Sequence, residues 1–403
     1  MTRILQTCLL LAAASLAVFL AGIRNPPVMF FDEKLYVDAG NAILRHTSDP
    51  SPYGPPLGKL LVAAGIAVAG DNSFGWRWPG AVCGAVTLVG VFLLIYFLLE
   101  DYTLALTAAL LTFLNNFLYV LSRIAMMDIY LVTFALWGVL AFVAAIKLPA
   151  VTRTRRRILL ALSGAAFGAA IACKWNGVDE LAVVFLLGVF LLLNTSTSSE
   201  LAECACNLGE AGAPFFVISF TAIPAAVYLA TFYPLFHSQH LAFSAHNLAS
   251  ANLFIWRFHR AVAGNTGLIV AWYKWPLMIA PTRGLSYLVG NWYVMWAGLL
   301  ALLWSLRRFG AALPETLLVS LYAVNMLQWI VTPQPCTFYY YYFPAATFLT
   351  LAIPAAVHRL PVRCLGVRLS VVSVLPALCV FAYCFAHMAH LGAPYDTMLG
   401  YWP

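Results

Sequence analysis

Long apolar runs separated by short polar stretches dominate the chain. A membrane-spanning helix needs about 20 mostly apolar residues. Runs of that kind occur at 4–22, 74–98, 102–121, 128–147, 158–174, 178–194, 213–235, 286–306, 313–332, 338–357 and 369–391, with ends set only to within several residues. The pattern therefore predicts an all-α polytopic membrane protein with about 11 transmembrane helices.

The first run has two interpretations. Arg3, an apolar stretch and Ala21-Gly22 follow one another in the order typical of a signal peptide. We expect a retained helix instead, because cleavage would leave Asp32 close to a free terminus with no anchor.

Two long segments, at about 23–73 and 236–285, separate groups of apolar runs. In the first, 38–44 and 57–69 have the pattern of short interfacial helices, and Pro55-Pro56 suits the start of the second. The second segment is rich in Trp, which favours the headgroup level of a bilayer. The sequence shows no internal repeat, which argues against an inverted-repeat transporter.

Composition supports the membrane class. Hydrophobic residues make up 63% of the chain, charged residues 9%, and the mean hydropathy is +0.87. A soluble domain is about half apolar and about a quarter charged. We expect residues 1–403 to form one membrane domain with no large soluble appendage. The net charge is +7, but the Lys and Arg residues are scattered through loops, so no nucleic-acid partner is expected.

Basic residues orient the predicted helices by where they cluster. Arg3, Arg153-Thr154-Arg155-Arg156-Arg157, Arg307-Arg308, and Arg359 with Arg363 and Arg368 all fall on one side. The positive-inside rule makes that side cytoplasmic, although a raw count of Lys and Arg is nearly balanced between the two sides. The two long segments are then non-cytoplasmic. We expect a bacterial inner membrane with the active site on its periplasmic or extracytoplasmic face.

Metal and disulfide chemistry find little support. The nine cysteines form no disulfide framework, and Cys204 and Cys206, which share a polar stretch, have no nearby partner for a metal. His237 and His240 have a spacing that suits one helix face, but no carboxylate lies in their segment. The sequence indicates no cofactor and leaves a divalent metal open.

Charged and aromatic motifs from distant parts of the chain fall on the predicted non-cytoplasmic face. They are Asp32-Glu33, Gly75-Trp76-Arg77, Arg123 with Asp128, Lys174-Trp175-Asn176-Gly177, and the aromatic run from Phe338 to Pro344. Such a set suits transfer from a lipid-linked phosphate. Arg and Lys would pair with the phosphate, and a carboxylate would take the proton of an acceptor hydroxyl. Cations would also stabilise the charge on the departing phosphate.

Several motifs occur in the order found in a known family. They are Phe31-Asp32-Glu33, Pro55-Pro56-Leu57-Gly58-Lys59, Gly75-Trp76-Arg77, Arg123 with Asp128, Gly168 through Lys174-Trp175, and Tyr342-Phe343-Pro344-Ala345. In these the chain resembles the protein O-mannosyltransferase family, glycosyltransferase family 39, which has the GT-C fold. The resemblance implies transfer of a sugar, usually mannose, from a polyprenyl phosphate to a hydroxyl on the non-cytoplasmic side, with inversion at the anomeric carbon.

The resemblance also implies roles for single residues. Asp32 is the expected base, with Glu33 beside it in positioning the acceptor or donor. Arg123 and Lys174 are expected contacts to the donor. Lys59, Arg77 and Asp128 complete the expected donor set, and Tyr341 and Tyr342 are expected to face the acceptor.

Two departures from the family pattern concern the acceptor. Gly54 stands where the family usually has His before Pro-Pro, and Tyr341 stands where it often has His in the aromatic run. The chain also lacks the soluble luminal repeats that eukaryotic members insert. We expect Ser or Thr of a protein as acceptor, with lipid and glycan left open.

Other interpretations remain for the same residues. Asp32 and Glu33 could cap a helix, where acidic groups favour the dipole. Arg123 and Asp128 could be an ion pair that ends two helices, Lys59 and Lys174 could snorkel, and Arg77 could anchor headgroups. For the whole chain the alternatives are transfer of aminoarabinose to lipid A or of a pentose to a glycan, a lipid-linked-sugar transporter, or a membrane scaffold.

Overall fold

The computed structural model describes residues 2–29, 32–149, 151–193, 198–261, 270–278, 290–332, 337–360 and 372–384, and these form α-helices joined by short 3-10 turns and loops. The helices are α1 (Thr2–Leu20), α2 (Glu33–Leu44), α3 (Leu57–Ala69), α4 (Ser73–Leu99), α5 (Tyr102–Phe113), α6 (Asn116–Leu121), α7 (Met127–Lys147), α8 (Arg153–Cys173), α9 (Gly177–Leu193), α10 (Ser199–Ala211), α11 (Ala213–Phe220), α12 (Ala222–Ala230), α13 (Phe232–Ser238), α14 (Ala245–Ala261), α15 (Trp292–Ser305), α16 (Leu313–Val331) and α17 (Phe343–His358). Short 3-10 turns are η1 (Trp272–Lys274), η3 (Leu306–Arg308) and η4 (Tyr339–Tyr342), and a further apolar helix runs over Val372–Cys384. The predicted all-α class is confirmed.

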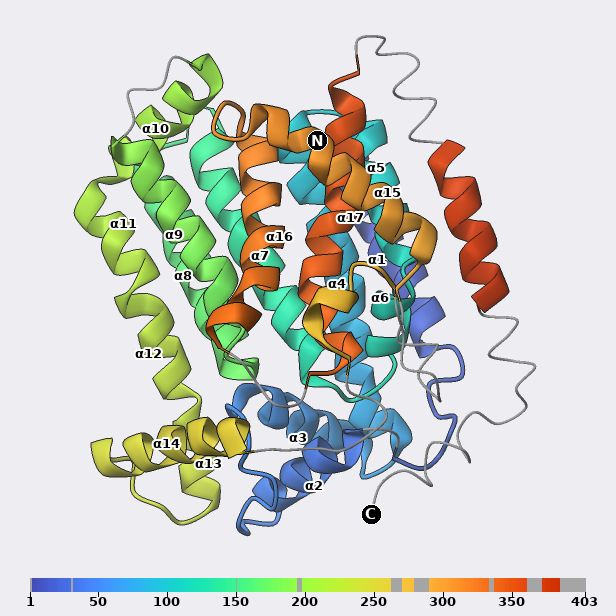
Figure 1. The fold of residues 1–403 in the computed structure, drawn as a ribbon. Coiled ribbons are helices and arrows are strands. Elements are labelled where there is room, and N and C mark those ends of the chain that lie inside the picture. Colours follow the sequence, from blue (N-terminus) through green and yellow to red (C-terminus); the bar gives the residue numbers. More distant parts are fainter. Residues whose placement is uncertain are drawn as a thin grey trace.

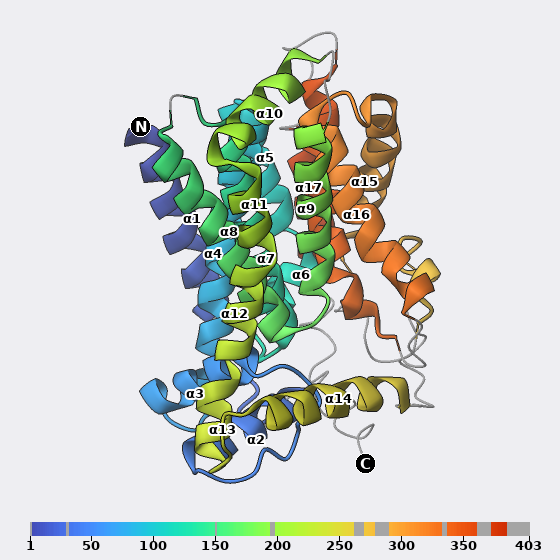
Figure 2. The ribbon, with the colours of Figure 1, turned by 90° about the vertical axis from the view of Figure 1, so that its left-hand side faces the viewer.

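The long helices stand side by side as a bundle, and four short helices gather at one of its ends. In Figure 1, α2, α3, α13 and α14 lie below the bundle, whereas α10 lies at its top, where α1 begins. Figure 2 shows the same division from the side, with α14 lying across the direction of the bundle helices. We call the lower end the site end and the upper end the basic end.

Six helical stretches are long and apolar enough to cross a membrane within the described part of the chain. They are Thr2–Leu20, Ser73–Leu99, Met127–Lys147, Arg153–Cys173, Ala213–Ser238 and Tyr339–His358. The other predicted spans also fall on helices, but those helices are shorter or less apolar by this measure, and residues 286–289, 369–371 and 385–391 of two spans lie outside the described residues. The number of eleven spans stays a prediction.

Two predicted spans differ from a single continuous helix. The run at 102–121 is divided into α5 and α6, because the side chain of Asn115 accepts the N–H of Phe117 and starts a new helix there. The run at 213–235 is divided into α11, α12 and α13. Its breaks lie at Thr221 and Thr231, shortly before Pro224 and Pro234, and proline supplies no N–H for the helical hydrogen bond.

The expectation of a polar loop at Cys204 and Cys206 is wrong, because this stretch forms α10. Its buried side chains are Leu201, Cys204, Leu208 and Ala211, which share one face of a helix. Cys204 is therefore buried while Cys206 is exposed. Residues two apart point to opposite sides of a helix, so the pair cannot chelate one ion.

The two short helices predicted in the first long segment are confirmed as α2 and α3, with α2 beginning earlier, at Glu33, while their interfacial position stays a prediction. Close packing joins this layer to the bundle. A Cβ atom on Gly58 of α3 would lie 2.0 Å from Sδ of Met127, at the start of α7. The side chain of Met127 therefore lies directly against the backbone of α3 at Gly58, which brings the start of α3 close to the site end of α7.

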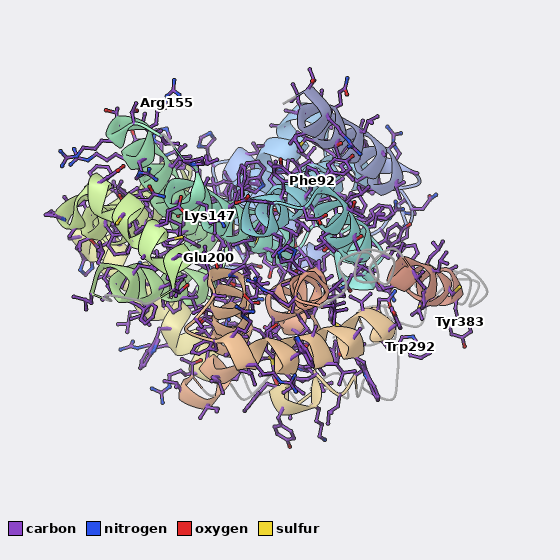
Figure 3. All side chains as sticks on the ribbon, turned by 90° about the horizontal axis from the view of Figure 1, so that it is seen from above. Phe92, Lys147, Arg155, Glu200, Trp292 and Tyr383 are labelled. Carbon is purple, nitrogen blue, oxygen red and sulfur yellow. The ribbon has the colours of Figure 1, made fainter. Side chains whose placement is uncertain are left out.

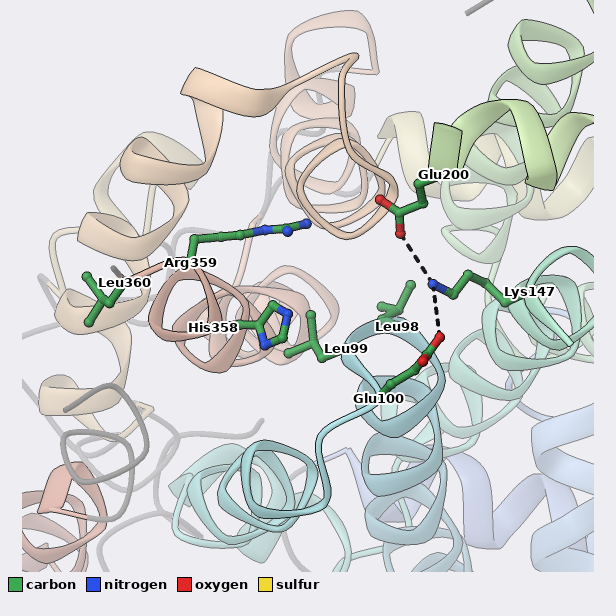
Figure 4. A pocket seen from close by; sticks show the side chains of 8 residues that line it. All are labelled: Leu98, Leu99, Glu100, Lys147, Glu200, His358, Arg359 and Leu360. Atoms are coloured by element: carbon green, nitrogen blue, oxygen red, sulfur yellow. Dashed lines mark hydrogen bonds and ion pairs between the residues drawn. The ribbon is translucent and has the colours of Figure 1, made fainter. Parts of the chain in front are cut away.

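Side chains at the basic end form a separate charge network. Arg155 lies at the rim of this end in Figure 3. Nζ of Lys147 lies 3.6 Å from Oε1 of Glu100 and 3.3 Å from Oε1 of Glu200, between the two carboxylates (Figure 4). Nε of Arg359 lies 2.7 Å from Oε1 of Glu315, a buried carboxylate at the start of α16. The basic residues of this end are thus partly neutralised by partners on neighbouring helices.

Candidate active site

Asp32 lies directly before α2, with only 8% of its surface exposed. Its side chain makes no hydrogen bond to the helix amides, so it does not act as a cap. Instead, Oδ2 accepts a hydrogen bond of 2.8 Å from the hydroxyl of Tyr340. Burial raises the pKa of Asp32 to about 6, and the charge of Asp128 adds to that, whereas the bond from Tyr340 and the charge of Lys174 lower it. Asp32 is therefore a carboxylate that titrates near neutrality.

Tyr340 comes from η4, far along the chain, and the sequence analysis passed over it in favour of Tyr341 and Tyr342. A run of four tyrosines indicates an aromatic patch, but it does not indicate which ring faces which neighbour. The 3-10 turn decides this, because about three residues make one turn and successive side chains point in different directions. Tyr340 thereby reaches Asp32, while Tyr342 points into the core.

Lys174 and Asp128 form the second half of the site. Nζ of Lys174 lies 2.8 Å from Oδ1 of Asp128, in the first turn of α7. The same ammonium lies 3.9 Å from the ring centre of Tyr341 and 5.4 Å from that of Tyr340. Such positions over aromatic faces favour a cation. Oδ2 of Asp128 is buried and makes no hydrogen bond within the described residues.

Tyr36, on α2, lies near both carboxylates and was not among the expected residues. Burial raises the pKa of Tyr36 well above its usual value, and the charges of Asp32 and Asp128 raise it further. The phenol therefore keeps its proton. Nothing in the sequence around Tyr36 distinguishes it from an ordinary aromatic residue of an interfacial helix. We call Asp32, Tyr36, Asp128, Lys174, Tyr340 and Tyr341 the Asp32 site.

Glu33 and Arg77 form a buried pair that serves the fold. Nε and Nη2 of Arg77 each lie 2.7 Å from an oxygen of Glu33. Oε1 of Glu33 also accepts the backbone N–H of Ala125 at 2.8 Å. The remaining N–H groups of Arg77 bind the carbonyl oxygens of Ile23, Pro26 and Val28. Every donor of the guanidinium is occupied, so the structure places Arg77 on Glu33 and the 23–28 segment, where the sequence analysis expected a donor contact.

The ammonium group of Lys59 also binds other residues of the protein. Its Nζ lies 2.8 Å from Oδ2 of Asp49 and binds the carbonyl oxygen of Ser51. Burial lowers the pKa of Lys59, whereas Asp49 raises it. The pair closes the loop before α3. These bonds give Lys59 a structural role, and its expected contact with the donor stays a prediction.

Arg123 contacts the end of α1. Its Nη1 donates to the carbonyl oxygens of Val18, Phe19 and Ala21 at 3.0, 2.9 and 2.6 Å. A cation in this position stabilises the negative end of the helix dipole. These contacts hold Arg123 at the site end, with the guanidinium directed to α1.

Tyr342 is fully buried, and its hydroxyl lies 3.2 Å from that of Tyr322. It packs with Phe117 and Trp275, so it belongs to the core and does not line an acceptor site. Tyr341 differs, because its ring contacts both the ammonium of Lys174 and the nearly parallel ring of Trp329, whose centroid is 5.5 Å away.

His259, near the end of α14, reaches the loop that precedes Pro55-Pro56. Its Nε2 lies 2.9 Å from the carbonyl oxygen of Tyr53, and the ring of Phe258 stacks on Tyr53 at 4.0 Å. A carbonyl only accepts, so Nε2 carries the proton and the neutral ring keeps a lone pair on Nδ1. Burial lowers the pKa of His259, as does the charge of Lys174. A Cβ atom on Gly54 would have no neighbouring atom within 4 Å.

The comparison with known proteins begins with the middle of the chain. Residues 67–240 match the family described as dolichyl-phosphate-mannose-protein mannosyltransferase. A polyprenol-phosphate-mannose–protein mannosyltransferase of Mycobacterium tuberculosis is 29% identical over 258 residues, which cover 57% of this chain and 48% of the relative. Its counterpart in Mycolicibacterium smegmatis is 28% identical over 268 residues, 58% of this chain and 50% of the relative. In these residues the chain is similar to the protein O-mannosyltransferase family. It spans about half the length of the curated relatives that it matches.

Solved structures show the fold of this O-mannosyltransferase relative. The S. cerevisiae Pmt1-Pmt2 complex bound to its sugar donor superposes with a TM-score of 0.78 and 14% identity, covering 94% of this chain and 89% of the other. ArnT from Cupriavidus metallidurans bound to undecaprenyl phosphate superposes with a TM-score of 0.63 and 15% identity, covering 93% of this chain and 63% of that one. The expected GT-C fold is thereby confirmed.

The O-mannosyltransferase motifs separate into two groups in this structure. Asp32, Asp128, Lys174 and Tyr341 gather in the Asp32 site. Glu33, Arg77, Lys59 and Arg123 hold the loops and helix ends around it, and Tyr342 is a core residue. Both groups come from helix ends at the site end, as the sequence analysis expected for all of them.

The histidines of the second long segment lie beside one from the first. The ring of His46 is 6.4 Å from that of His237 and 6.0 Å from that of His240, measured between centroids. Within the described ranges, no group of three or more His, Cys, Asp or Glu side chains is placed to hold a metal ion.

Proposed function

We propose that the chain transfers a sugar, with mannose as the first candidate, from a polyprenyl-phosphate donor to an acceptor hydroxyl. The observation that carries the proposal is Asp32. It is a nearly buried carboxylate with a pKa of about 6. It accepts a hydrogen bond from Tyr340 and interacts electrostatically with Asp128 and Lys174. The names of the related mannosyltransferases favour mannose as the sugar and Ser or Thr of a protein as the acceptor.

The proposed step is a direct displacement. Asp32 takes the proton of the acceptor hydroxyl, and the hydroxyl oxygen forms a bond to the anomeric carbon. The bond between that carbon and the phosphate oxygen breaks at the same time, and the lipid phosphate leaves with the electron pair. Attack from the opposite face inverts the anomeric configuration. The hydrogen bond of Tyr340 uses Oδ2, so we assign the proton to Oδ1.

Lys174 is the proposed partner of the departing phosphate. Its ammonium contacts Asp128 and the ring of Tyr341 while keeping 22% of its side chain exposed. A fixed cation stabilises negative charge that develops on a leaving group, commonly by two to three orders of magnitude in rate (~10²–10³). Arg123, whose recorded hydrogen bonds all use Nη1, is a second proposed phosphate contact. A donor affinity that is unchanged in Arg123→Ala would remove it from the proposal.

The membrane arrangement is part of the proposal. The site end lies opposite the basic end, so the positive-inside rule directs the Asp32 site to the non-cytoplasmic face. A bacterial inner membrane and a single catalytic domain over residues 1–403 complete it. The donor's lipid tail would lie in the bilayer beside the bundle, with its phosphate at headgroup height.

The test is transfer by the purified protein in lipid. Labelled polyprenyl-phosphate mannose is supplied with a mixture of proteins, glycans and lipids as acceptors. We expect label on protein hydroxyls with the wild type, and a loss of at least about a hundredfold in Asp32→Asn. Glu100→Gln, which changes an exposed carboxylate at the basic end, is the matched control and keeps its activity. Transfer at the wild-type rate in Asp32→Asn would refute the base assignment, and label on lipid A or glycan would replace the protein acceptor.

A further inference from the structure

A second polar cluster lies between α9 and α16 at the site end. Asp179 and Glu180 are in the first turn of α9, just beyond Lys174 in the chain. Glu180 is fully buried, and its Oε1 accepts a hydrogen bond of 3.0 Å from Nδ2 of Asn325 on α16. Asp179 is half-buried. Two adjacent carboxylates at the end of an apolar helix are costly to keep there without a purpose.

Three polar atoms of this cluster are buried and make no hydrogen bond within the described residues. They are Oδ2 of Asp179, Oε2 of Glu180 and Nε1 of Trp329. Trp329 follows Asn325 by one helical turn and so lies on the same face of α16. A buried polar atom without a partner costs about 1–3 kcal/mol. Two acceptors and one donor in this position therefore indicate a site for a ligand that both donates and accepts hydrogen bonds.

Amide side chains complete the cluster. Nδ2 of Asn176 donates to Oε1 of Gln328 at 2.8 Å, and Nε2 of Gln328 donates to the carbonyl oxygen of Asn325 at 3.3 Å. Asn176, Gln328 and Asp179 are half-buried, whereas Glu180, Asn325 and Trp329 are buried. The cluster thus extends from half-buried polar side chains to fully buried ones.

The cluster is continuous with the Asp32 site through Tyr341. The ring of Trp329 stacks on that of Tyr341 with centroids 5.5 Å apart and planes 11° apart. The ammonium of Lys174 lies 3.9 Å from the centre of Tyr341. One aromatic ring therefore joins the proposed phosphate partner to the α9–α16 cluster.

The chemistry of the cluster distinguishes between ligands. A phosphate would add negative charge beside two adjacent carboxyl groups in a largely buried position, so it does not suit the cluster. A metal ion needs more ligands than the described residues bring together. A neutral ring with several hydroxyls suits it, because hydroxyls donate to carboxylates and accept from an indole N–H.

We propose that Asp179, Glu180, Asn325 and Trp329 bind the hydroxyl groups of the hexose ring on the donor and so select the sugar that is transferred. This inference rests on the proposed function, since it concerns the donor of that reaction. The lipid phosphate is held by Lys174, and the sugar extends past Tyr341 to the cluster. The bare lipid phosphate lacks those hydroxyls and makes no contact with the cluster.

The test compares two ligands that differ only in the sugar. The affinities of the full-length protein for polyprenyl-phosphate mannose and for bare polyprenyl phosphate are measured with the wild type, Asp179→Asn, Glu180→Gln and the double variant. We expect the variants to lose about tenfold or more in affinity for the mannose-bearing lipid, because the hydrogen bonds between the carboxyl groups and the sugar hydroxyls are weakened or lost. Their affinity for the bare lipid is expected to stay unchanged.

Controls separate a binding role from a structural one. Glu315→Gln removes a buried carboxylate of α16 at the basic end, and it should change neither affinity. Equal losses for both lipids, or no loss for either, would overturn the proposal. If the double variant fails to fold, the single variants test the proposal. Asp179→Asn is expected to fold, since Asp179 is half-buried and its Oδ2 makes no hydrogen bond within the described residues. A change confined to the KM of the acceptor peptide would overturn the assignment to the donor.

Failure of the proposed function is distinguishable from failure of this inference. If the wild type transfers no mannose, the same paired comparison is made with polyprenyl phosphates that carry glucose or aminoarabinose. A loss in the variants that depends on the sugar supports the cluster as a sugar site, even though mannose is then the wrong donor. The same affinities across all sugars and the bare lipid overturn it.

Discussion

Asp32 and Glu33 are neighbours in sequence with opposite roles in the structure. Successive residues of a helix point about 100° apart, so the two carboxylates face different surroundings. Glu33 accepts from Arg77 and from the backbone of Ala125, and these bonds make it part of the scaffold. Asp32 faces Tyr340 and the charges of Asp128 and Lys174. The adjacent scaffold pair fixes where Asp32 stands, and burial sets its pKa.

The pH dependence of transfer follows from that pKa. A general base acts in its deprotonated form, so the rate is expected to fall as the pH drops through about 6, the raised pKa of Asp32. An aspartate with an ordinary pKa of about 3.9 would keep full activity well below that pH. The measurement is kcat/KM against pH, and the low-pH limb should persist in His259→Asn. A rate that stays flat down to about pH 5 would contradict the role of Asp32 as base.

Arg77→Lys is expected to destabilise the protein. Lysine cannot bind the carboxylate of Glu33 and three carbonyl oxygens together, so buried acceptors lose their partner. A buried acceptor that loses its partner costs about 1–3 kcal/mol, which thermal unfolding in detergent would show as a lower midpoint. Arg45→Lys changes an exposed pair with Asp71, 3.7 Å apart, and should have little effect. Wild-type stability with weakened donor binding in Arg77→Lys would restore its phosphate role.

At the scale of elements, hydrophobic periodicity predicted the existence and order of the helices well. It failed where single polar residues or prolines divide a run, as at Asn115 and at Pro224 and Pro234. For the site residues, too, the sequence predicted the general arrangement but not its details. Motif spacing predicted that Asp32, Asp128 and Lys174 converge. It did not predict that the hydroxyl of Tyr340 binds Asp32, or that Glu33 binds the guanidinium of Arg77. Those outcomes depend on side-chain direction, which a spacing does not contain.

Helix α14 is expected to be held at the site end by its last turn. Among its residues only Ile255 is buried. Phe258 and His259 contact Tyr53, and Leu248 and Ala251 pack against the cluster that contains Ile43 and Ala63. Phe258→Ala removes a stack worth about 0.5–1.5 kcal/mol, so amide hydrogen exchange in α14 should speed up about threefold to tenfold, while the bundle's exchange stays unchanged. Trp256→Ala, at an exposed neighbouring position, is the control. Equal exchange in both variants would show that the stack does not hold the helix.

At the scale of the molecule, charge is divided between two ends of one bundle. The basic end neutralises its cations with Glu100, Glu200 and Glu315, and the site end combines carboxylates with aromatic rings and a lysine. The division fits an enzyme whose donor arrives from the bilayer and reacts on one face only. It does not fit a transporter, which needs a substrate site open to both faces in turn.

The sidedness of the two ends can be measured with single cysteines. Cys206 is exposed on α10 at the basic end, and Ser250 is exposed on α14 at the site end. In variants that keep only Cys206 or carry only Ser250→Cys, a membrane-impermeant thiol reagent applied to intact cells should label Ser250→Cys and leave Cys206 unlabelled. Opening the cells should expose Cys206, because the positive-inside rule predicts a cytoplasmic location for the end with clustered Arg residues. The reverse pattern would place the Asp32 site in the cytoplasm and, with it, require a donor that presents its phosphate there.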